Sequence, residues 1–366
     1  MSAPVNPQIA GLTPYQPGKP IDELTRELGV TDIIKLASNE NPRGPGPRVR
    51  AALTAAGRSL SRYPDGNGYS LKRTLASRLG VDENQLTLGN GSNDVLEQAA
   101  KIALVPGAEA IIAAHSFVVY RLAVTSCNGT LITTPAKDYG ADLSAFLDAV
   151  TDKTAIVFLA NPNNPTGTWV GENELVDFLE ALGPDVWVVL DEAYWEYVDE
   201  PGYPDGTKLL ERYANLIVTR TFSKIHGLAA LRVGYGISSP LAADLMNRAR
   251  QPFNVNSLAL AAAEAALQDQ SFTATSRQMN KTGKQYLQSG LDNLGLVYIP
   301  SAANFLCVDV GMESMPVYEA LLQEGVIVRP VAEYGLPDHL RVTVGLPEEN
   351  ERFLDTLGRI IEELRA

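Results

Sequence analysis

The sequence predicts an α/β fold in which a mainly parallel sheet carries helices on both of its faces. Short apolar runs rich in β-branched residues indicate the central strands: Ala110–Ala113, Ala155–Leu159, Val186–Leu190 and Leu216–Val218. Helix-like stretches alternate with these runs, among them Ser92–Ala103 and Glu172–Leu182. Such alternation is typical of parallel sheets covered on both sides. Ligands of these sheets bind at the carboxyl ends of the strands.

The pattern of helix-like and strand-like segments changes after Pro252, which indicates a smaller α+β unit. Helices are expected at Ser257–Gln268, Gln278–Leu294 and Glu348–Leu364, and strands at Asn304–Val310, Val326–Val328 and Leu340–Val344. Six prolines among the first 42 residues suit an arm that lies across a neighbour or across the site. We therefore expect an arm with part of the small domain (1–45), a large ligand-binding domain (46–255) and a small C-terminal domain (256–366).

Composition excludes several classes of function. The net charge of −13, without a cluster of Lys and Arg, argues against nucleic-acid or anionic-membrane binding. The three histidines lack metal-ligand spacing, so no metal site is expected. Cys127 and Cys307 are interpreted as reduced core thiols. The N-terminus is polar and no run reaches the ~20 apolar residues of a membrane span, so we expect a cytoplasmic protein.

The segment T-F-S-K, which ends at Lys224, places two hydroxyls and an amine shortly after the run Leu216–Val218. Arg232 follows eight residues later. Hydroxyls and a guanidinium suit a phosphate dianion. A lysine among cationic or apolar neighbours has a lowered pKa, and its neutral amine can form an imine with an aldehyde. A lone lysine is more often a solvated surface residue, but these neighbours favour a reactive one.

Two further polar segments follow strand-like runs. Asp191 ends the run Val186–Leu190, where a carboxylate is costly unless it meets a positive partner such as a protonated pyridine nitrogen. Tyr194, three residues on, can reach the phenolic oxygen of the same ring. The segment N-P-N-N-P-T-G at 161–167 contains Asn164, whose amide can donate to that oxygen. The alternatives without a function are that Asp191 starts a helix and that the segment at 161–167 is a turn.

The segment G-N-G-S-N-D at 89–94 opens the helix-like stretch Ser92–Ala103. Glycines allow close backbone approach, and free amides at a helix N-terminus bind phosphate. The dinucleotide fingerprint G-x-G-x-x-G is incomplete, because Asp94 stands where the third glycine would be. The segment therefore predicts a phosphate site near Ser92 and Asn93.

These motifs, in this order, resemble those of the fold-type I pyridoxal-phosphate aminotransferases over nearly the whole chain. Five segments are similar to the histidinol-phosphate branch of that family: S-N-E-N-P at 38–42, R-Y-P-D at 62–65, R-T-F-S-K at 220–224, R-Q-P-F-N-V-N at 250–256 and L-R-V-T-V-G at 340–345. The resemblance implies a seven-stranded-type sheet, pyridoxal 5′-phosphate as the cofactor, small-molecule substrates and a homodimer.

The resemblance also implies roles for residues. Lys224 would be the Schiff-base lysine that moves a proton between Cα and C4′, Asp191 would pair with the pyridine nitrogen, and Asn164 and Tyr194 would hold the ring oxygen. Phe117 would stack on the ring. The cofactor phosphate would be held by Gly91, Ser92, Asn93, Thr221, Ser223 and Arg232, together with Tyr63 from the partner subunit.

On the substrate side, the resemblance places Arg341 at the carboxylate of the amino-acid donor, and Arg329 and Tyr15 at the substrate phosphate. Asn39, Asn164 and Asn304 are further substrate-side candidates. Histidinol phosphate carries CH₂-phosphate where an amino acid has its carboxylate, so extra positive charge is needed there.

The function implied is a ping-pong transamination between L-histidinol phosphate and 2-oxoglutarate in histidine biosynthesis. One alternative is an aminotransferase for aromatic amino acids, in which Arg341 would suffice. A remote alternative is a non-catalytic cofactor- or nucleotide-binding protein. Three residues depart from the family pattern: His226 stands where an aromatic residue is expected, and His115 and Phe117 replace the usual proline and tyrosine. We expect His226 to pack or to form a hydrogen bond.

Overall fold

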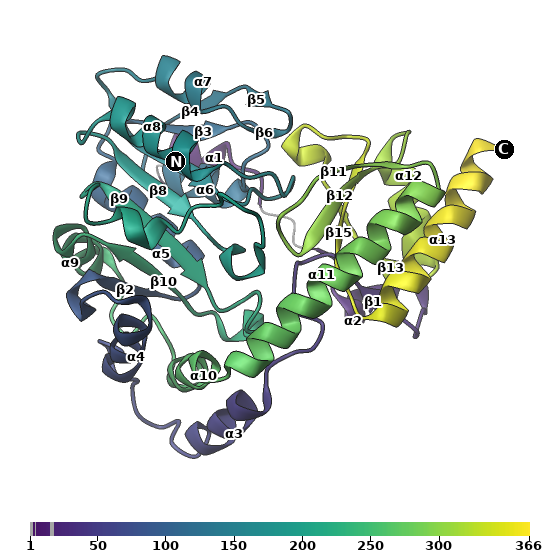
Figure 1. Ribbon diagram of the computed structural model, residues 1–366, viewed down its shortest axis with the longest axis horizontal. Helices are drawn as coiled ribbons and strands as arrows, with labels where there is room; N and C mark the ends of the chain where they lie inside the picture. The colour runs from purple at the N-terminus through teal and green to yellow at the C-terminus, as the bar shows by residue number, and fades with distance from the viewer. Residues whose placement is uncertain (1–2, 4, 15–17) are drawn as a thin grey trace.

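The computed structural model describes residues 3, 5–14 and 18–366, which form a large and a small lobe (Figure 1). The large lobe is built on a seven-stranded sheet. Its strands, in spatial order, are β2 (Leu86–Gly89), β10 (Gly234–Ser238), β9 (Leu216–Thr221), β8 (Trp187–Asp191), β7 (Thr154–Ala160), β3 (Glu109–Ala113) and β4 (Thr130–Thr134). Strand β10 pairs antiparallel with both β2 and β9, and the other strand pairs of this sheet are parallel. The predicted fold class is confirmed.

The central strands are apolar throughout because each of their faces is buried in a different core. Val188 and Leu190 of β8 belong to one core, whereas Val189 between them belongs to the other. Successive side chains of a strand point to opposite faces of the sheet. A strand covered on both faces must therefore be apolar at every position, and this is the pattern that predicted a parallel sheet.

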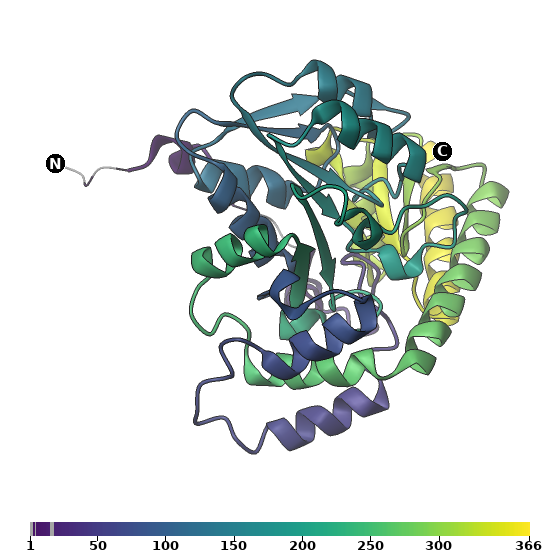
Figure 2. The same cartoon turned by 60° about the vertical axis from the view of Figure 1, so that its left-hand side comes forward.

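Helices cover both faces of the sheet, as predicted. The first face buries side chains of α3 (Pro47–Ala56), α4 (Tyr69–Leu79), α7 (Leu143–Asp148), α8 (Glu172–Leu182) and α10 (Ser257–Leu267). The second face buries side chains of α5 (Ser92–Ala103), α6 (Val118–Ser126) and α9 (Pro240–Ala249). Figure 2 shows α3 packed along α10 at the bottom of the large lobe.

The small lobe has a four-stranded antiparallel sheet, in the order β11 (Val297–Ile299), β12 (Phe305–Asp309), β15 (His339–Thr343) and β14 (Arg329–Pro330). It packs with α11 (Gln270–Asn293), α12 (Ser314–Gln323) and α13 (Pro347–Arg365). Helix α11 begins eight residues before the predicted Gln278, because the Asp269 side chain accepts from the amide of Phe272 and caps the helix there. Strand β1 (Ile34–Lys35) joins β13 (Val326–Ile327) in parallel, so part of the N-terminal segment belongs to this lobe.

The remaining elements are short or peripheral. They are α1 (Pro7–Ala10), which contacts α6, α2 (Ile21–Leu28), β5 (Ala136–Lys137), β6 (Gly140–Ala141) and the 3-10 turns η1 (Glu83–Gln85), η2 (Trp195–Tyr197), η3 (Gly206–Leu209), η4 (Ala229–Leu231) and η5 (Ala332–Tyr334). Both cysteines are free thiols, but Cys127 is only half-buried, whereas burial raises the pKa of Cys307 to about 12. Within the part of the chain described, no helix has the length and apolar character needed to cross a membrane.

Candidate active site

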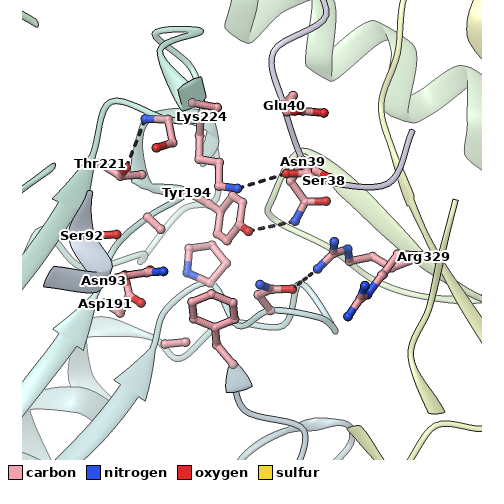
Figure 3. Close-up of a pocket in the computed structure, with 18 of the residues that line it drawn as sticks. Ser38, Asn39, Glu40, Ser92, Asn93, Asp191, Tyr194, Thr221, Lys224 and Arg329 are labelled. Carbon is pink, nitrogen blue, oxygen red and sulfur yellow. Dashed lines mark hydrogen bonds between the residues drawn. The ribbon is translucent and has the colours of Figure 1, made fainter. Parts of the chain in front are cut away.

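A cavity of about 220 Å³ lies where the two lobes meet. The parallel strands β7, β8 and β9 all end at this edge of the large sheet, so the residues at and after their carboxyl ends converge there. The small lobe contributes Arg329 and Arg341, and the N-terminal segment contributes residues 37–40. In Figure 3, Ser92, Asn93 and Asp191 lie on one side of the cavity and Arg329 lies on the other.

Lys224 extends into the cavity from the turn that follows β9 (Figure 3). Its Nζ donates to the carbonyl of Ser38 at 3.3 Å and lies 5.4 Å from the centre of the Tyr194 ring. Burial, and after it the positive charge of Arg341, lower the pKa of Lys224 to about 7. A large share of this lysine is therefore a neutral, nucleophilic amine at neutral pH.

Asp191 faces the side of the sheet covered by α5 and α6, because it lies two residues after Val189, which is buried on that side. Thr219 is its neighbour across the β8–β9 pair and donates to Oδ1 at 3.1 Å. The hydroxyl of Tyr120, on α6, donates to Oδ2 at 2.8 Å. Burial raises the pKa of Asp191, and the hydrogen bonds from Tyr120 and Thr219 oppose that shift. These two donors therefore favour the charged carboxylate.

A cup for a phosphate group is formed around the N-terminus of α5. Gly91 precedes the helix at a φ of +83°, and a Cβ there would lie 2.4 Å from Nη2 of Arg232. A Cβ on Gly234 would lie 2.4 Å from the amide of Ser92. Only glycine fits at either position. Arg232 is itself in the left-handed region, at a φ of +55°, and its Nη1 donates to Ser223 Oγ at 3.3 Å. Free helix amides, hydroxyls and a guanidinium are the donors that a phosphate dianion requires.

Three asparagines organise the opposite wall. Nδ2 of Asn39 donates to the hydroxyl of Tyr194 at 2.9 Å, and Oδ1 of Asn164 accepts from Nη1 of Arg341 at 2.5 Å. Asn304 is not among the residues that line the cavity, but its side-chain amide donates to the carbonyl of Asn39 at 3.1 Å. Asn39 has a φ of +55°, an uncommon conformation that these contacts maintain.

Arg329 and Arg341 are directly opposite each other in the β14–β15 pair. Directly opposed residues of an antiparallel pair point to the same face of the sheet. Both side chains are buried and line the cavity. Nη2 of Arg341 donates to the carbonyl of Ala37 at 2.6 Å, whereas its buried Nε has no hydrogen-bond partner among the residues described. Such a donor at a cavity wall suits an anionic ligand.

The structure brings together most of the residues predicted for the site. The cavity is lined by Asn39, Ser92, Asn93, Phe117, Asn164, Asp191, Tyr194, Thr221, Ser223, Lys224, Arg232, Arg329 and Arg341. Tyr63 lies elsewhere: its side chain is 83% exposed and stacks on Phe253 at a centroid distance of 4.8 Å. Tyr15 lies outside the described residues. His226 is buried, 3.5 Å from a carboxylate oxygen of Glu196 and with its ring 5.0 Å from that of Phe222, which fits the packing role expected for it.

Sequence reasoning missed Tyr120, Thr219 and Ser38. Tyr120 lies three residues after Phe117, one helical turn on, and Thr219 lies two residues before Thr221, on the same face of its strand. These spacings are signals that could have identified both. Ser38 contributes through its backbone carbonyl, so its side-chain type carries no such signal.

The donor set fits the cofactor that the sequence motifs imply. The phosphate cup, the carboxylate of Asp191 and the amine of Lys224 all line one cavity, in which Asn164 and Tyr194 also lie. A phosphate, a pyridine nitrogen and an aldehyde each find a chemically matched partner among these groups. The residues therefore fit pyridoxal 5′-phosphate.

Comparison with known proteins gives consistent relatives. The family described as "Aminotransferase class I and II" matches residues 31–357. A histidinol-phosphate aminotransferase 2 of Pseudomonas fluorescens (strain Pf0-1) is 56% identical over 97% of this chain and 96% of its own, and one of Pseudomonas aeruginosa is 54% identical over 97% of each. The crystal structure of histidinol-phosphate aminotransferase from Sinorhizobium meliloti in complex with pyridoxal-5′-phosphate has a TM-score of 0.91 at 30% identity, over 100% of this chain and 99% of that one.

Proposed function

The chain belongs to the class I and II aminotransferase family, and from this premise we propose that it is a histidinol-phosphate aminotransferase. It transfers the amino group of L-histidinol phosphate to 2-oxoglutarate. The products are 3-(imidazol-4-yl)-2-oxopropyl phosphate and L-glutamate. The reaction belongs to histidine biosynthesis, and the cofactor is pyridoxal 5′-phosphate.

The pairing of Arg329 with Arg341 across β14 and β15 is the observation that carries the choice of substrate. A simple aromatic amino acid presents one carboxylate, for which one guanidinium suffices. Histidinol phosphate presents a phosphate dianion, and Arg forks bind phosphate through two parallel hydrogen bonds. Two buried guanidiniums on one face of the sheet, in the same cavity as Lys224, therefore favour the phosphate substrate over the aromatic alternative.

When bound, the cofactor supplies an electron-withdrawing ring that accepts the charge left when the substrate loses its Cα proton. The phosphate cup, built from Gly91, Ser92, Asn93, Thr221, Ser223 and Arg232, anchors the group at one end. Asp191 would accept a hydrogen bond from the ring nitrogen and keep a proton on it. Asn164 and Tyr194 would hold the ring oxygen, and Phe117 would lie against the ring.

Lys224 moves the proton in the reaction. A pKa of about 7 would let the free amine of Lys224 act as a base near neutral pH. With the cofactor bound, this amine would be the group that removes the Cα proton of the substrate and returns a proton to the product. Arg341 would hold the carboxylate of glutamate or 2-oxoglutarate, and Arg329 would hold the phosphate of histidinol phosphate.

The exposure of Tyr63 supports a homodimer in which this tyrosine reaches the cofactor phosphate of the partner subunit. An exposed aromatic pair, Tyr63 and Phe253, is a feature of association surfaces.

The bounds predicted for the large domain, residues 46–255, and the cytoplasmic location of the protein remain predictions.

Replacing Lys224 with Ala tests the catalytic assignment. Turnover should be lost, because no amine remains to exchange with the donor or to move the proton, while the phosphate cup still binds the cofactor. The measurement is glutamate-coupled turnover together with cofactor content after gel filtration. Wild-type turnover in this variant would refute the assignment.

Replacing Arg329 with Leu tests the substrate. Loss of hydrogen bonds to a charged group costs about 1.5–3 kcal/mol, so kcat/KM for histidinol phosphate should fall by about tenfold to a hundredfold. For phenylalanine it should change little. Arg359→Leu is the matched control, because Arg359 forms a surface ion pair with Glu324 at 3.1 Å, away from the cavity. An unchanged kcat/KM for histidinol phosphate would favour the aromatic alternative, in which Arg341 suffices.

A further inference from the structure

The guanidinium of Arg329 is paired with a carboxylate of its own chain. Its Nη2 donates to Oε1 of Glu333, which lies four residues on, within η5. The side chain of Arg329 is only 9% exposed, whereas that of Glu333 is 40% exposed. The ion pair therefore joins a buried cation of the cavity wall to a carboxylate that solvent reaches.

Glu333 also borders a second hollow beside the cavity. This hollow, of about 250 Å³, is lined by Glu333 and by the exposed Arg121, and Phe117 and Tyr334 separate it from the cavity by lining both. A Glu333 side chain that leaves Arg329 can therefore turn into this hollow, where Arg121 offers another cation.

The charges on this wall need compensation when no substrate is bound. Like charges that are directly opposite in a strand pair destabilise each other, and Arg329 and Arg341 are such a pair. Arg341 donates to neutral oxygens of Asn164 and Ala37, whereas Arg329 meets a full negative charge on Glu333. Of the two guanidiniums, Arg329 is the one whose anion-binding capacity is already in use.

We propose that Glu333 is a specificity-determining residue that occupies Arg329 until the anionic end of the substrate displaces it. The proposal rests on the function proposed above. A ligand without an anionic group that faces Arg329 leaves the Arg329–Glu333 pair intact, so no buried cation is left unpaired. A phosphate dianion competes with the single carboxylate and displaces it toward the neighbouring hollow. Because ion pairs with an exposed member are weak, this competition changes affinity by at most about fivefold.

Glu333→Gln tests the proposal in the holoenzyme, with histidinol phosphate and histidinol as a pair of donors that differ only in the phosphate. The KM for histidinol phosphate should fall about twofold to fivefold, because the competing charge is gone, while kcat changes less than twofold. The kcat/KM for histidinol should not rise, since this donor has no anion for Arg329. Glu324→Gln, which removes the carboxylate of the surface pair with Arg359, should leave both values unchanged.

An unchanged or raised KM for histidinol phosphate in Glu333→Gln would overturn the proposal, as would an equal gain for histidinol. If the glutamine variant does not yield holoenzyme, Glu333→Ala makes the same test. Failure of the proposed function has a different signature, because the wild-type enzyme itself would then not turn over histidinol phosphate.

Discussion

The hydrogen bond from Tyr120 to Asp191 gives the sharpest prediction about catalysis. Tyr120→Phe removes one hydroxyl, while the ring can keep its stacking on Phe158 (5.2 Å between centroids) and its edge contact with Phe117 (5.9 Å). The change therefore isolates the hydrogen bond. Burial, with the charge of Asp191, raises the pKa of Tyr120 well above its usual value, so in the wild type this phenol is a donor at neutral pH.

The expected loss follows from the partners of Asp191. A hydrogen bond to a buried charged group contributes about 1.5–3 kcal/mol. Thr219 still donates to the other oxygen, so we expect the lower end of this range, which corresponds to a loss of about tenfold in kcat/KM. The pKa of Asp191 is already raised by burial, and without Tyr120 it rises further. The charged carboxylate then persists only at higher pH, so the acid limb of the pH profile should move to higher pH.

The assay is kcat/KM for histidinol phosphate as a function of pH, together with the affinity of the cofactor-free protein for pyridoxal 5′-phosphate. Tyr213→Phe is the matched control: Tyr213 is buried, its hydroxyl is 3.5 Å from a carboxylate oxygen of Glu180, and it does not line the cavity. A Tyr120→Phe enzyme with kcat/KM within twofold of wild type and an unshifted acid limb would refute the reasoning.

Three further predictions concern the lysine, the sheet and the dimer. Cofactor-free protein should bind pyridoxal 5′-phosphate covalently, which borohydride traps, at a rate that rises up to a pH of about 7 and then levels. The reason is that burial lowers the pKa of Lys224 to about 7 and only the neutral amine reacts. A rate still rising at much higher pH would contradict this. Arg220→Leu should lower the free energy of unfolding, measured by urea denaturation, by about 3–5 kcal/mol. The reason is that the Arg220 side chain is 2% exposed and pairs with the fully buried Glu192 at 2.7 Å. A loss close to zero would show that the pair contributes little. Mixing Lys224→Ala with Tyr63→Ala subunits should give more activity than the sum of the activities of the two separate variants. In a mixed dimer, one of the two sites has both an intact Lys224 and an intact Tyr63. A mixture without that gain would argue against a shared site.

Much of the site could be predicted because its residues lie next to recognisable local patterns. Asp191, Asn164 and Lys224 each follow an apolar run that forms a strand, and all three strands are parallel, so their ends meet at one edge of the sheet. The helix Ser92–Ala103 was predicted with the bounds it has in the structure, since its glycine-rich start and its apolar periodicity lie within one short window.

The sequence by itself determined the α/β class, four central strands of the large sheet, several of the helices, and the residue types that suit a phosphate and a reactive amine. Periodicity and turn residues act over a few neighbouring positions, so these features can be predicted locally. Only the tertiary structure decided that Arg329 lies opposite Arg341, that Tyr120 supports Asp191 and that Glu333 occupies Arg329. Strand register and the meeting of two lobes depend on how distant surfaces pack. A short β14 of two residues carries no pattern from which its register could be predicted.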